Sequence, residues 1–165
     1  MKHCDLGRVI SDERCKELTD EILSEVGRRM ELETPNPEIN TAIGGDTPLM
    51  WDLLMDLQDL VSKTVGKKVS YHHPYCKIFK NGSKLFEHND AEYLDWAVSV
   101  NVFSNLKNEY PLRVRNEDGS ITDYPMEVGH ASLVKGNELR HWRDTLVCGE
   151  EEYAIQIFLF YTERK

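Results

Sequence analysis

Three side chains could together bind a divalent metal ion: His88 and Asp90, two residues apart, and His141, much farther along the chain. Two imidazoles and one carboxylate cap one face of an octahedral Fe(II) and leave positions open for O2 and a co-substrate. Residues i and i+2 of a strand point to the same side, so His88 and Asp90 can bind one metal at a strand end. His141 must then come from another strand that lies alongside. The spacing therefore predicts a metal centre that activates O2.

The residues before His88 give this short motif its context. Phe79, Gly82 and Leu85 precede His88 at three-residue steps, which indicates a strand, a glycine turn and a second short strand that carries the ligands. This pattern resembles the Fe(II)- and 2-oxoglutarate-dependent dioxygenases, specifically their prolyl 4-hydroxylase-like branch, in which tyrosine is usual where Phe79 stands. The resemblance covers roughly residues 70–163. Beyond the motif it rests on three segments: 96–102, 134–143 and 153–161.

The resemblance implies an enzyme and its cofactors. Members of the family oxidatively decarboxylate 2-oxoglutarate to succinate and CO2 and hydroxylate a second substrate, using Fe(II) and O2. His88, Asp90 and His141 match the family's ligand positions residue by residue and are the expected catalytic centre. Because a fold is a poor guide to a substrate, we expect only a small-molecule or peptide substrate: a peptidyl proline, an amino acid or a small metabolite.

The residue expected to bind the distal carboxylate of 2-oxoglutarate differs from the one usual in the family. That 5-carboxylate needs a buried cation, and the family usually has Arg or Lys at the start of the last strand, where this chain has Glu152. Either the cation comes from elsewhere or the co-substrate differs, and we favour the first explanation. Arg143 lies two residues after His141 and would share its inward face on a strand, so it is the expected cation. Arg113, on a neighbouring strand, is the alternative.

Other residues are expected around the co-substrate. Gln156 would face the barrel interior, where it either touches the co-substrate or is a core amide with satisfied hydrogen bonds. Phe79 replaces a tyrosine whose hydroxyl often helps to hold 2-oxoglutarate, and Tyr71 or Tyr75 could substitute from the same strand. Aromatic core packing is the alternative interpretation for each of these rings.

Two other classes of function stay open on the sequence alone. A barrel that kept the metal site but lost turnover would be a catalytically silent binding or sensing module, and Glu152 is the feature that favours it. A cupin-like metalloenzyme without a keto acid more often uses two nearby histidines, a glutamate and a third histidine. That arrangement needs His72 and His73, whose side chains should point in opposite directions on a strand.

Length and composition predict one globular domain. The 165 residues are 40% hydrophobic and 30% charged, with a formal net charge of −9. This acidity argues against binding of nucleic-acid backbones, which needs clustered Lys and Arg. The four cysteines have no paired short spacing, which favours reduced thiols in a cytoplasmic protein. We expect no signal peptide and no membrane span, and a monomer or homodimer.

The periodicity of apolar residues predicts helices first and strands afterwards. Leu18, Ile22 and Val26 recur at helical spacing after the N-cap candidate Ser11, which predicts a helix over about 12–30. A second helix, capped near Thr47, is predicted over about 48–65. Pro- and Gly-rich loops are predicted at 33–40 and 42–48, and strands at 69–79, 97–103, 112–115, 121–124, 131–134 and 153–161.

This order of elements predicts a mainly β protein of the α+β class. We expect a double-stranded β-helix barrel (jelly-roll, cupin-like) with the N-terminal helices packed outside it. Residues 1–165 would form a single Fe(II)/2-oxoglutarate dioxygenase domain, with a helical support region in 1–67 and the barrel core in 68–163. The hairpin within 107–124 would form a rim or lid over the site.

Overall fold

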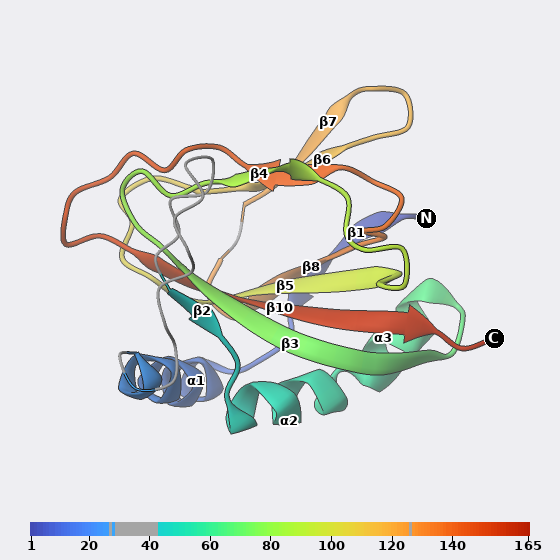
Figure 1. Cartoon of the computed structure of the whole chain (residues 1–165), viewed down its shortest axis with the longest axis horizontal. Helices are drawn as coiled ribbons and strands as arrows, with labels where there is room; N and C mark the ends of the chain where they lie inside the picture. Colours follow the sequence, from blue (N-terminus) through green and yellow to red (C-terminus); the bar gives the residue numbers. More distant parts are fainter. Residues whose placement is uncertain (27, 29–42, 126) are drawn as a thin grey trace.

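Two facing β-sheets and a layer of helices make up the fold, as Figure 1 shows for the computed structural model. The structure describes residues 1–26, 28, 43–125 and 127–165. The larger sheet contains β1 (His3–Arg8), β2 (Ile43–Gly45), β3 (Val69–Phe79), β5 (Trp96–Ser104), β8 (His130–Val134) and β10 (Ala154–Glu163). The smaller sheet contains β4 (Leu85–His88), β6 (Leu112–Arg115), β7 (Ile121–Tyr124) and β9 (His141–Arg143). The helices are α1 (Asp12–Glu25), α2 (Pro48–Asp56) and α3 (Gln58–Val65).

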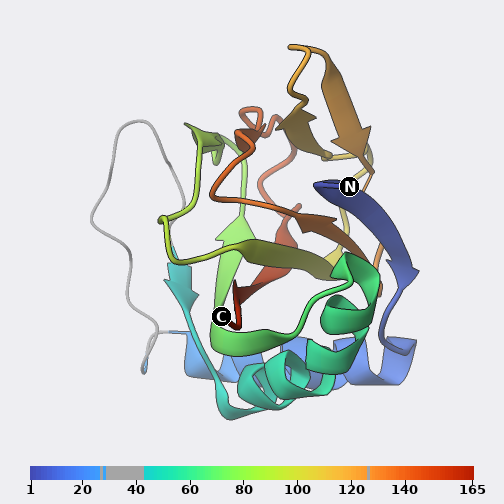
Figure 2. The ribbon, with the colours of Figure 1, turned by 90° about the vertical axis from the view of Figure 1, so that its right-hand side faces the viewer.

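The strand order is that of a double-stranded β-helix. The larger sheet runs β1-β8-β5-β10-β3-β2 and the smaller one β4-β9-β6-β7, with antiparallel pairing throughout the described strands. Chain neighbours such as β3 and β4 lie in different sheets, so the chain crosses between the layers and closes a barrel. Figure 2 shows the layers from the side, with the helices under the larger sheet. The predicted mainly β jelly-roll class is confirmed.

The helices pack on the outer face of the larger sheet because each presents one apolar side. Leu18 and Ile22 of α1 and Leu53 and Leu54 of α2 are buried in the same core cluster as the outward-facing residues of the sheet. That cluster includes Val98, Val100, Leu133, Ile155, Ile157 and Leu159. The opposite face of the same strands is left to line the interior of the barrel.

Both predicted N-caps are present. The Ser11 hydroxyl accepts a hydrogen bond from the N–H of Arg14, and the Thr47 hydroxyl accepts one from the N–H of Met50. The first helix ends at Glu25, and positions 27, 29 and 30 of its predicted range lie outside the described residues. The second predicted helix is two helices, because the chain turns at Leu57 between α2 and α3.

The first 67 residues also contain two strands that the sequence pattern did not predict. β1 pairs with β8 at one edge of the larger sheet, and β2 pairs with β3 at the other. Edge strands are short and half-exposed, so they lack the apolar alternation of inner strands. β2 lies within the predicted loop 42–48, whereas residue 42 and the predicted loop 33–40 lie outside the described residues. Among the described residues, no helix is both long and apolar enough to cross a bilayer.

One buried hydroxyl joins β10 to α2. The fully buried Tyr161 donates a 2.8 Å hydrogen bond to the backbone carbonyl of Leu54. We expect Tyr161→Phe to lower the free energy of unfolding by about 1–1.5 kcal/mol, because the carbonyl loses a buried partner. Urea unfolding followed by circular dichroism would measure it. The matched change Tyr71→Phe, at an exposed ring, should cost less than about 0.5 kcal/mol. Equal losses of unfolding free energy in both variants would show that the Tyr161 hydrogen bond does not stabilise the fold.

Candidate active site

Pairing of two short strands brings the three predicted ligands together. β4 and β9 are antiparallel, with His88 opposite His141 and Leu85 opposite Arg143. Asp90 follows β4, where its backbone N–H donates a 2.8 Å hydrogen bond to the carbonyl of Gly136. One potential ligand atom from each of His88, Asp90 and His141 lies within 4.8 Å of the other two. In the part of the chain that the structure describes, these are the only His, Cys, Asp or Glu side chains that form such a group of three.

Backbone carbonyls orient both imidazoles toward Asp90. The Nδ1 atom of His88 is 2.7 Å from the carbonyl of Phe86, and that of His141 is 2.9 Å from the carbonyl of Leu139. A carbonyl can only accept, so each Nδ1 must carry the donated proton. Each Nε2 lies 3.4 Å from Oδ1 of Asp90. Metal-binding histidines are typically held this way, with one nitrogen fixed by an outer partner and the other presented to the ion.

The charges of the cluster favour a bound cation. Burial by itself raises the pKa of Asp90, but hydrogen bonds with His141 and His88 outweigh burial and hold that pKa well below its usual range. Burial lowers the pKa of His88, but Asp90 and the carbonyl of Phe86 together raise it above its ordinary value. The pocket therefore stabilises an ionised carboxylate with positive charge beside it. A divalent ion can take the place of that positive charge.

A glycine fixes the orientation of the Asp90 carboxylate. Oδ2 of Asp90 is buried and has no hydrogen-bond partner. It rests against Gly136, where a Cβ atom would lie only 1.8 Å from it. This packing leaves Oδ1 facing the two histidines, so position 136 admits no side chain while the carboxylate stays in place. Gly136 was not predicted from the sequence, because its role depends on a contact between segments 46 residues apart in the chain.

The three predicted metal ligands line a cavity of about 220 Å³, called the metal cavity below. Its walls are mostly apolar, with Leu85, Phe158 and Phe160 among the lining residues. Tyr75, one of the predicted co-substrate residues, also lines this cavity. So does Lys77, whose ammonium group lies 5.9 Å from the centre of the Tyr75 ring. Lys77 was not predicted from the sequence, although it shares one face of β3 with Tyr75 and Phe79 at a spacing of two residues.

Arg143 is the most buried charged residue of the described chain. It is 1% exposed and lies on β9 two residues after His141. Its Nη1 donates a 3.0 Å hydrogen bond to the carbonyl of Tyr110, and its guanidinium lies 5.7 Å from the centres of both the Phe79 and Tyr110 rings. Its Nε and Nη2 atoms are buried without a partner. Burial lowers the pKa of Arg143 to about 10. A buried cation with unused donors can bind an anion, although Arg143 itself is not among the residues that line the metal cavity.

The other predicted co-substrate residues lie in different places. Phe79 is fully buried and packs against Arg143. Gln156 is 1% exposed on the inner face of β10, but it does not line the cavity that contains the metal ligands. Arg113 points to the outer face of the smaller sheet, where it forms ion pairs of 2.9 Å with Asp123 and 3.1 Å with Asp144. The structure therefore does not bring Arg113 to the site.

Glu152 caps a loop and does not line the metal cavity. Its carboxylate accepts hydrogen bonds of 2.8 Å from the N–H of Lys107 and 2.5 Å from the N–H of Gly149. The bonds to Gly149 and Lys107 lower its pKa. The residue is half-buried, and neither the lining of the metal cavity nor the causes that shift the pKa of Arg143 include it. The loop 144–153 instead separates the last strand from β9.

One expectation about His72 and His73 was wrong. A register shift between β10 and β3 pairs Phe160 with His73 but Tyr161 with Tyr71, so a bulge falls at His72. The two imidazoles therefore meet, with 2.6 Å between their Nδ1 atoms. No glutamate and third histidine join them among the described residues, so the cupin-like ligand set is not assembled there.

Comparison of whole structures places this fold among known oxygenases, although no protein-family model and no curated protein sequence matches the chain. A Pseudomonas putida prolyl-4-hydroxylase superimposes with a TM-score of 0.73 at 11% identity, over 99% of this chain and 94% of that one. The viral collagen prolyl hydroxylase of Paramecium Bursaria Chlorella virus-1, in its 2-oxoglutarate complex, gives 0.71 at 11% identity, over 100% and 97%. HygX from Streptomyces hygroscopicus, with nickel, 2-oxoglutarate and hygromycin B bound, gives 0.70 at 13% identity, over 98% and 82%. At such low identity these similarities establish the fold.

Proposed function

We propose that this protein is an Fe(II)- and 2-oxoglutarate-dependent oxygenase. His88, Asp90 and His141 would hold the iron, and Arg143 would bind the 5-carboxylate of 2-oxoglutarate. The observation that carries the proposal is Arg143: a fully buried guanidinium with two unused nitrogen donors, on the same strand as one metal ligand. The three oriented ligands and the shared fold support it.

The chain's own side chains would prepare the reaction. Fe(II) bound here would supply O2 activation, so that 2-oxoglutarate is decarboxylated to succinate and CO2 while a substrate is hydroxylated. Phe79 and Tyr110 would exclude water around Arg143 and so strengthen its hold on a carboxylate. The carbonyls of Phe86 and Leu139 would keep the two imidazoles oriented while ligands exchange.

The substrate would be a small molecule or a peptide that enters past aromatic rings. Phe160 lines the metal cavity and stacks on His73, with 4.8 Å between ring centres, and His72 and the exposed Tyr93 continue the row outward. Flat apolar surfaces of this kind accept ring-shaped or aliphatic groups. Solved structures of the same fold include a collagen prolyl hydroxylase and a protein with hygromycin B bound. The fold therefore does not distinguish a peptide substrate from a small-molecule substrate.

We also propose that residues 1–165 act as one domain. The strands β1 and β2 belong to the same sheet as the barrel strands, so the segment 1–67 completes the barrel as well as supporting it. The three metal ligands and Arg143 all lie within residues 68–163. The hairpin β6–β7 projects from the smaller sheet, as Figure 2 shows, and we expect it to border a bound substrate although none of its described residues lines the metal cavity.

The test of the proposed function is turnover of 2-oxoglutarate. Wild-type protein with Fe(II), O2 and a reductant should convert 2-oxoglutarate to succinate, followed by NMR, even slowly and without a substrate. His141→Ala should form none, because one of only three iron ligands is lost. A catalytically silent barrel, the second candidate, would bind metal and 2-oxoglutarate but yield no succinate under any condition.

Glu152 provides a separate check on where the co-substrate binds. We expect Glu152→Gln to change the dissociation constant of 2-oxoglutarate by less than about twofold, because the carboxylate binds backbone N–H groups and does not line the metal cavity. Calorimetric titration of the Co(II)-loaded protein would measure it. Tighter binding by tenfold or more would show that Glu152 does oppose the co-substrate, and the Arg143 site would then be misplaced.

A further inference from the structure

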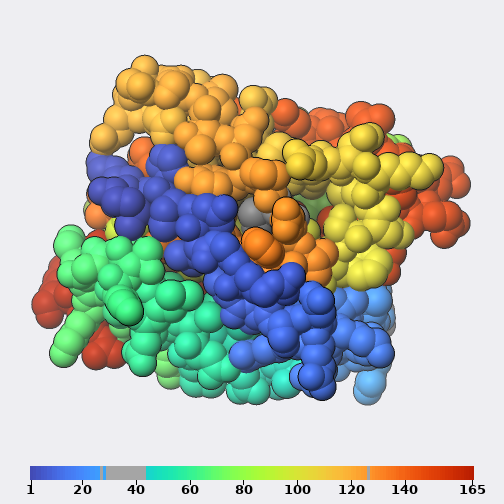
Figure 3. Space-filling view, turned by 180° about the vertical axis from the view of Figure 1, so that it is seen from behind, coloured from blue at the N-terminus to red at the C-terminus, as the bar shows by residue number. Residues whose placement is uncertain are grey.

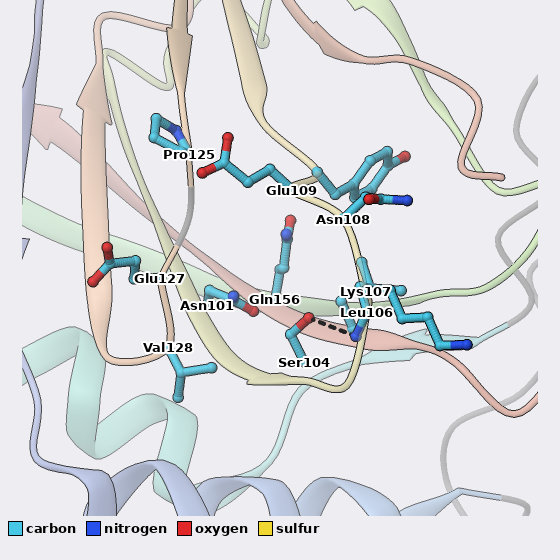
Figure 4. A pocket seen from close by; sticks show the side chains of 12 residues that line it. Asn101, Ser104, Leu106, Lys107, Asn108, Glu109, Pro125, Glu127, Val128 and Gln156 are labelled. Carbon is cyan, nitrogen blue, oxygen red and sulfur yellow. Dashed lines mark hydrogen bonds between the residues drawn. The ribbon is translucent and has the colours of Figure 1, made fainter. Parts of the chain in front are cut away.

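A second pocket, of about 300 Å³, opens into the barrel and shares no residue with the metal cavity. Figure 4 shows it between the segment 104–110, which begins at the last residue of β5, and residues Pro125, Glu127 and Val128, which precede β8. In the space-filling view of Figure 3 the surface is hollowed between the orange and the yellow segments. Its volume is sufficient for a molecule the size of a small metabolite.

The floor of this pocket contains a buried acceptor without a partner. Gln156 is 1% exposed, lines the pocket, and its Oε1 atom has no hydrogen-bond partner. In Figure 4 its amide extends from the sheet toward Glu109. Asn101, 3% exposed, lies opposite Gln156 in the register of β5 and β10 and lines the same floor. A buried amide oxygen left without a donor is costly, so the site suits a ligand that supplies one.

The rim of the pocket carries negative charge. Glu109 and Glu127 line it, and within the described residues no ion pair or hydrogen bond engages the Glu109 carboxylate. Glu127 lies 3.5 Å from the imidazole of His130. Lys107 is the one cation among the lining residues, and its ammonium group points away from Gln156 in Figure 4. Carboxylates over an amide acceptor attract a donor-bearing cation and repel a carboxylate.

The second pocket is distinct from the proposed co-substrate site but adjacent to it. Ser99 and Phe158 line the metal cavity, and Asn101 and Gln156, two residues away on the same strands and the same face, line the second pocket. The two spaces thus follow one another along the barrel interior. The ligands proposed for them differ in charge, because Arg143 would bind an anion whereas Glu109 and Glu127 line the second pocket.

We propose that this second pocket binds a small organic cation with N–H donors, such as an aliphatic primary ammonium compound. The ammonium group would donate to Oε1 of Gln156 and pair with Glu109. This assignment does not depend on the iron or on 2-oxoglutarate. It also differs from both interpretations of Gln156 drawn from the sequence, because the amide neither lines the metal cavity nor has both of its polar atoms satisfied.

The test compares two probes of equal length and different charge. Calorimetric titration of the protein should show saturable one-to-one binding of 1,4-diaminobutane and none of 1,4-butanediol. The titration is done in about 150 mM salt, at which the Debye length is about 8 Å. Glu109→Gln should weaken the diamine about fivefold, as expected for a partly exposed ion pair. Gln156→Met should weaken it about tenfold, since a charge-assisted hydrogen bond is lost.

Two controls make the result decisive. Glu117→Gln removes the same charge from the exposed β6–β7 hairpin and should leave diamine affinity unchanged. His88→Ala should also leave it unchanged, which separates this site from the metal cavity. Chemical-shift changes confined to residues 101–110 and 154–156 would locate the diamine even if one variant folded poorly. Equal weakening by Glu109→Gln and Glu117→Gln, or equal binding of the diol, would overturn the proposal.

Discussion

Replacing Arg143 with methionine is expected to remove 2-oxoglutarate binding while metal binding persists and the protein becomes more stable. The guanidinium is 1% exposed, and in the part of the chain that the structure describes it pairs with no carboxylate. Truncating one partner of a buried, hydrogen-bonded charge pair costs about 2–5 kcal/mol. The dissociation constant for 2-oxoglutarate should therefore rise by about 100-fold or more.

The gain in stability is the distinguishing part of this result. Nε and Nη2 of Arg143 are buried without partners, and burial lowers its pKa to about 10. Methionine has a similar volume and no charge to desolvate, and such replacements often stabilise by about 1–4 kcal/mol. The carbonyl of Tyr110 loses its hydrogen-bond donor, which reduces this gain in stability by about 1 kcal/mol. If Arg143 served only to stabilise the fold, its replacement by methionine would lower the free energy of unfolding.

The matched control for Arg143 is Arg113. It carries the same charge on the neighbouring strand β6, but its ion pairs with Asp123 and Asp144 lie on the outer face. Arg113→Met should change 2-oxoglutarate affinity by less than about threefold and should not raise stability. Calorimetry on Co(II)-loaded protein and thermal unfolding would measure both quantities. Undiminished 2-oxoglutarate binding by Arg143→Met would refute the assignment.

Gly136→Ala is expected to weaken metal binding without touching a ligand. An added Cβ would lie 1.8 Å from Oδ2 of Asp90, so the carboxylate must rotate or the 135–139 turn must shift. Outer-shell changes of this kind typically reduce metal affinity by about 10- to 100-fold. Competition of Co(II) between the protein and a chelating dye would measure the change.

A double-mutant cycle separates this mechanism from general damage to the fold. In an Asp90→Ala background the carboxylate is absent, so the added methyl group at position 136 meets no oxygen. We therefore expect Gly136→Ala to destabilise the wild-type chain more than the Asp90→Ala chain, with a coupling of about 1 kcal/mol or more. If both backgrounds lose the same free energy of unfolding, the methyl group acts on the turn and not on Asp90.

Much of the barrel could be anticipated because its inner strands are buried and alternate strongly. The segments 97–103 and 153–161 are rich in β-forming residues and became β5 and β10. The spacing of His88 and Asp90 and the i+2 relation of His141 and Arg143 likewise follow from the geometry of a strand. Local periodicity is sufficient wherever a side chain's direction depends only on its own strand.

Features that depend on pairing between distant segments could not be anticipated. The bulge at His72 shifts the register of β3 against β10, and within β3 only Pro74 indicates an irregular strand without giving the position of the shift. The role of Gly136 appears only when its turn packs on Asp90. The family's pattern aligns Glu152 with the usual cation position, whereas in the structure its carboxylate accepts hydrogen bonds from the backbone N–H groups of Lys107 and Gly149.

The most direct test of the proposed iron and 2-oxoglutarate site is an anaerobic titration of the Fe(II)-loaded protein with 2-oxoglutarate. A keto acid chelated to an open iron site with two imidazoles and one carboxylate gives a weak visible charge-transfer band. We expect this band to grow to one equivalent, to be absent in His141→Ala, and to require far more 2-oxoglutarate in Arg143→Met. Iron bound in stoichiometric amount with no band at any 2-oxoglutarate concentration would contradict the proposed function.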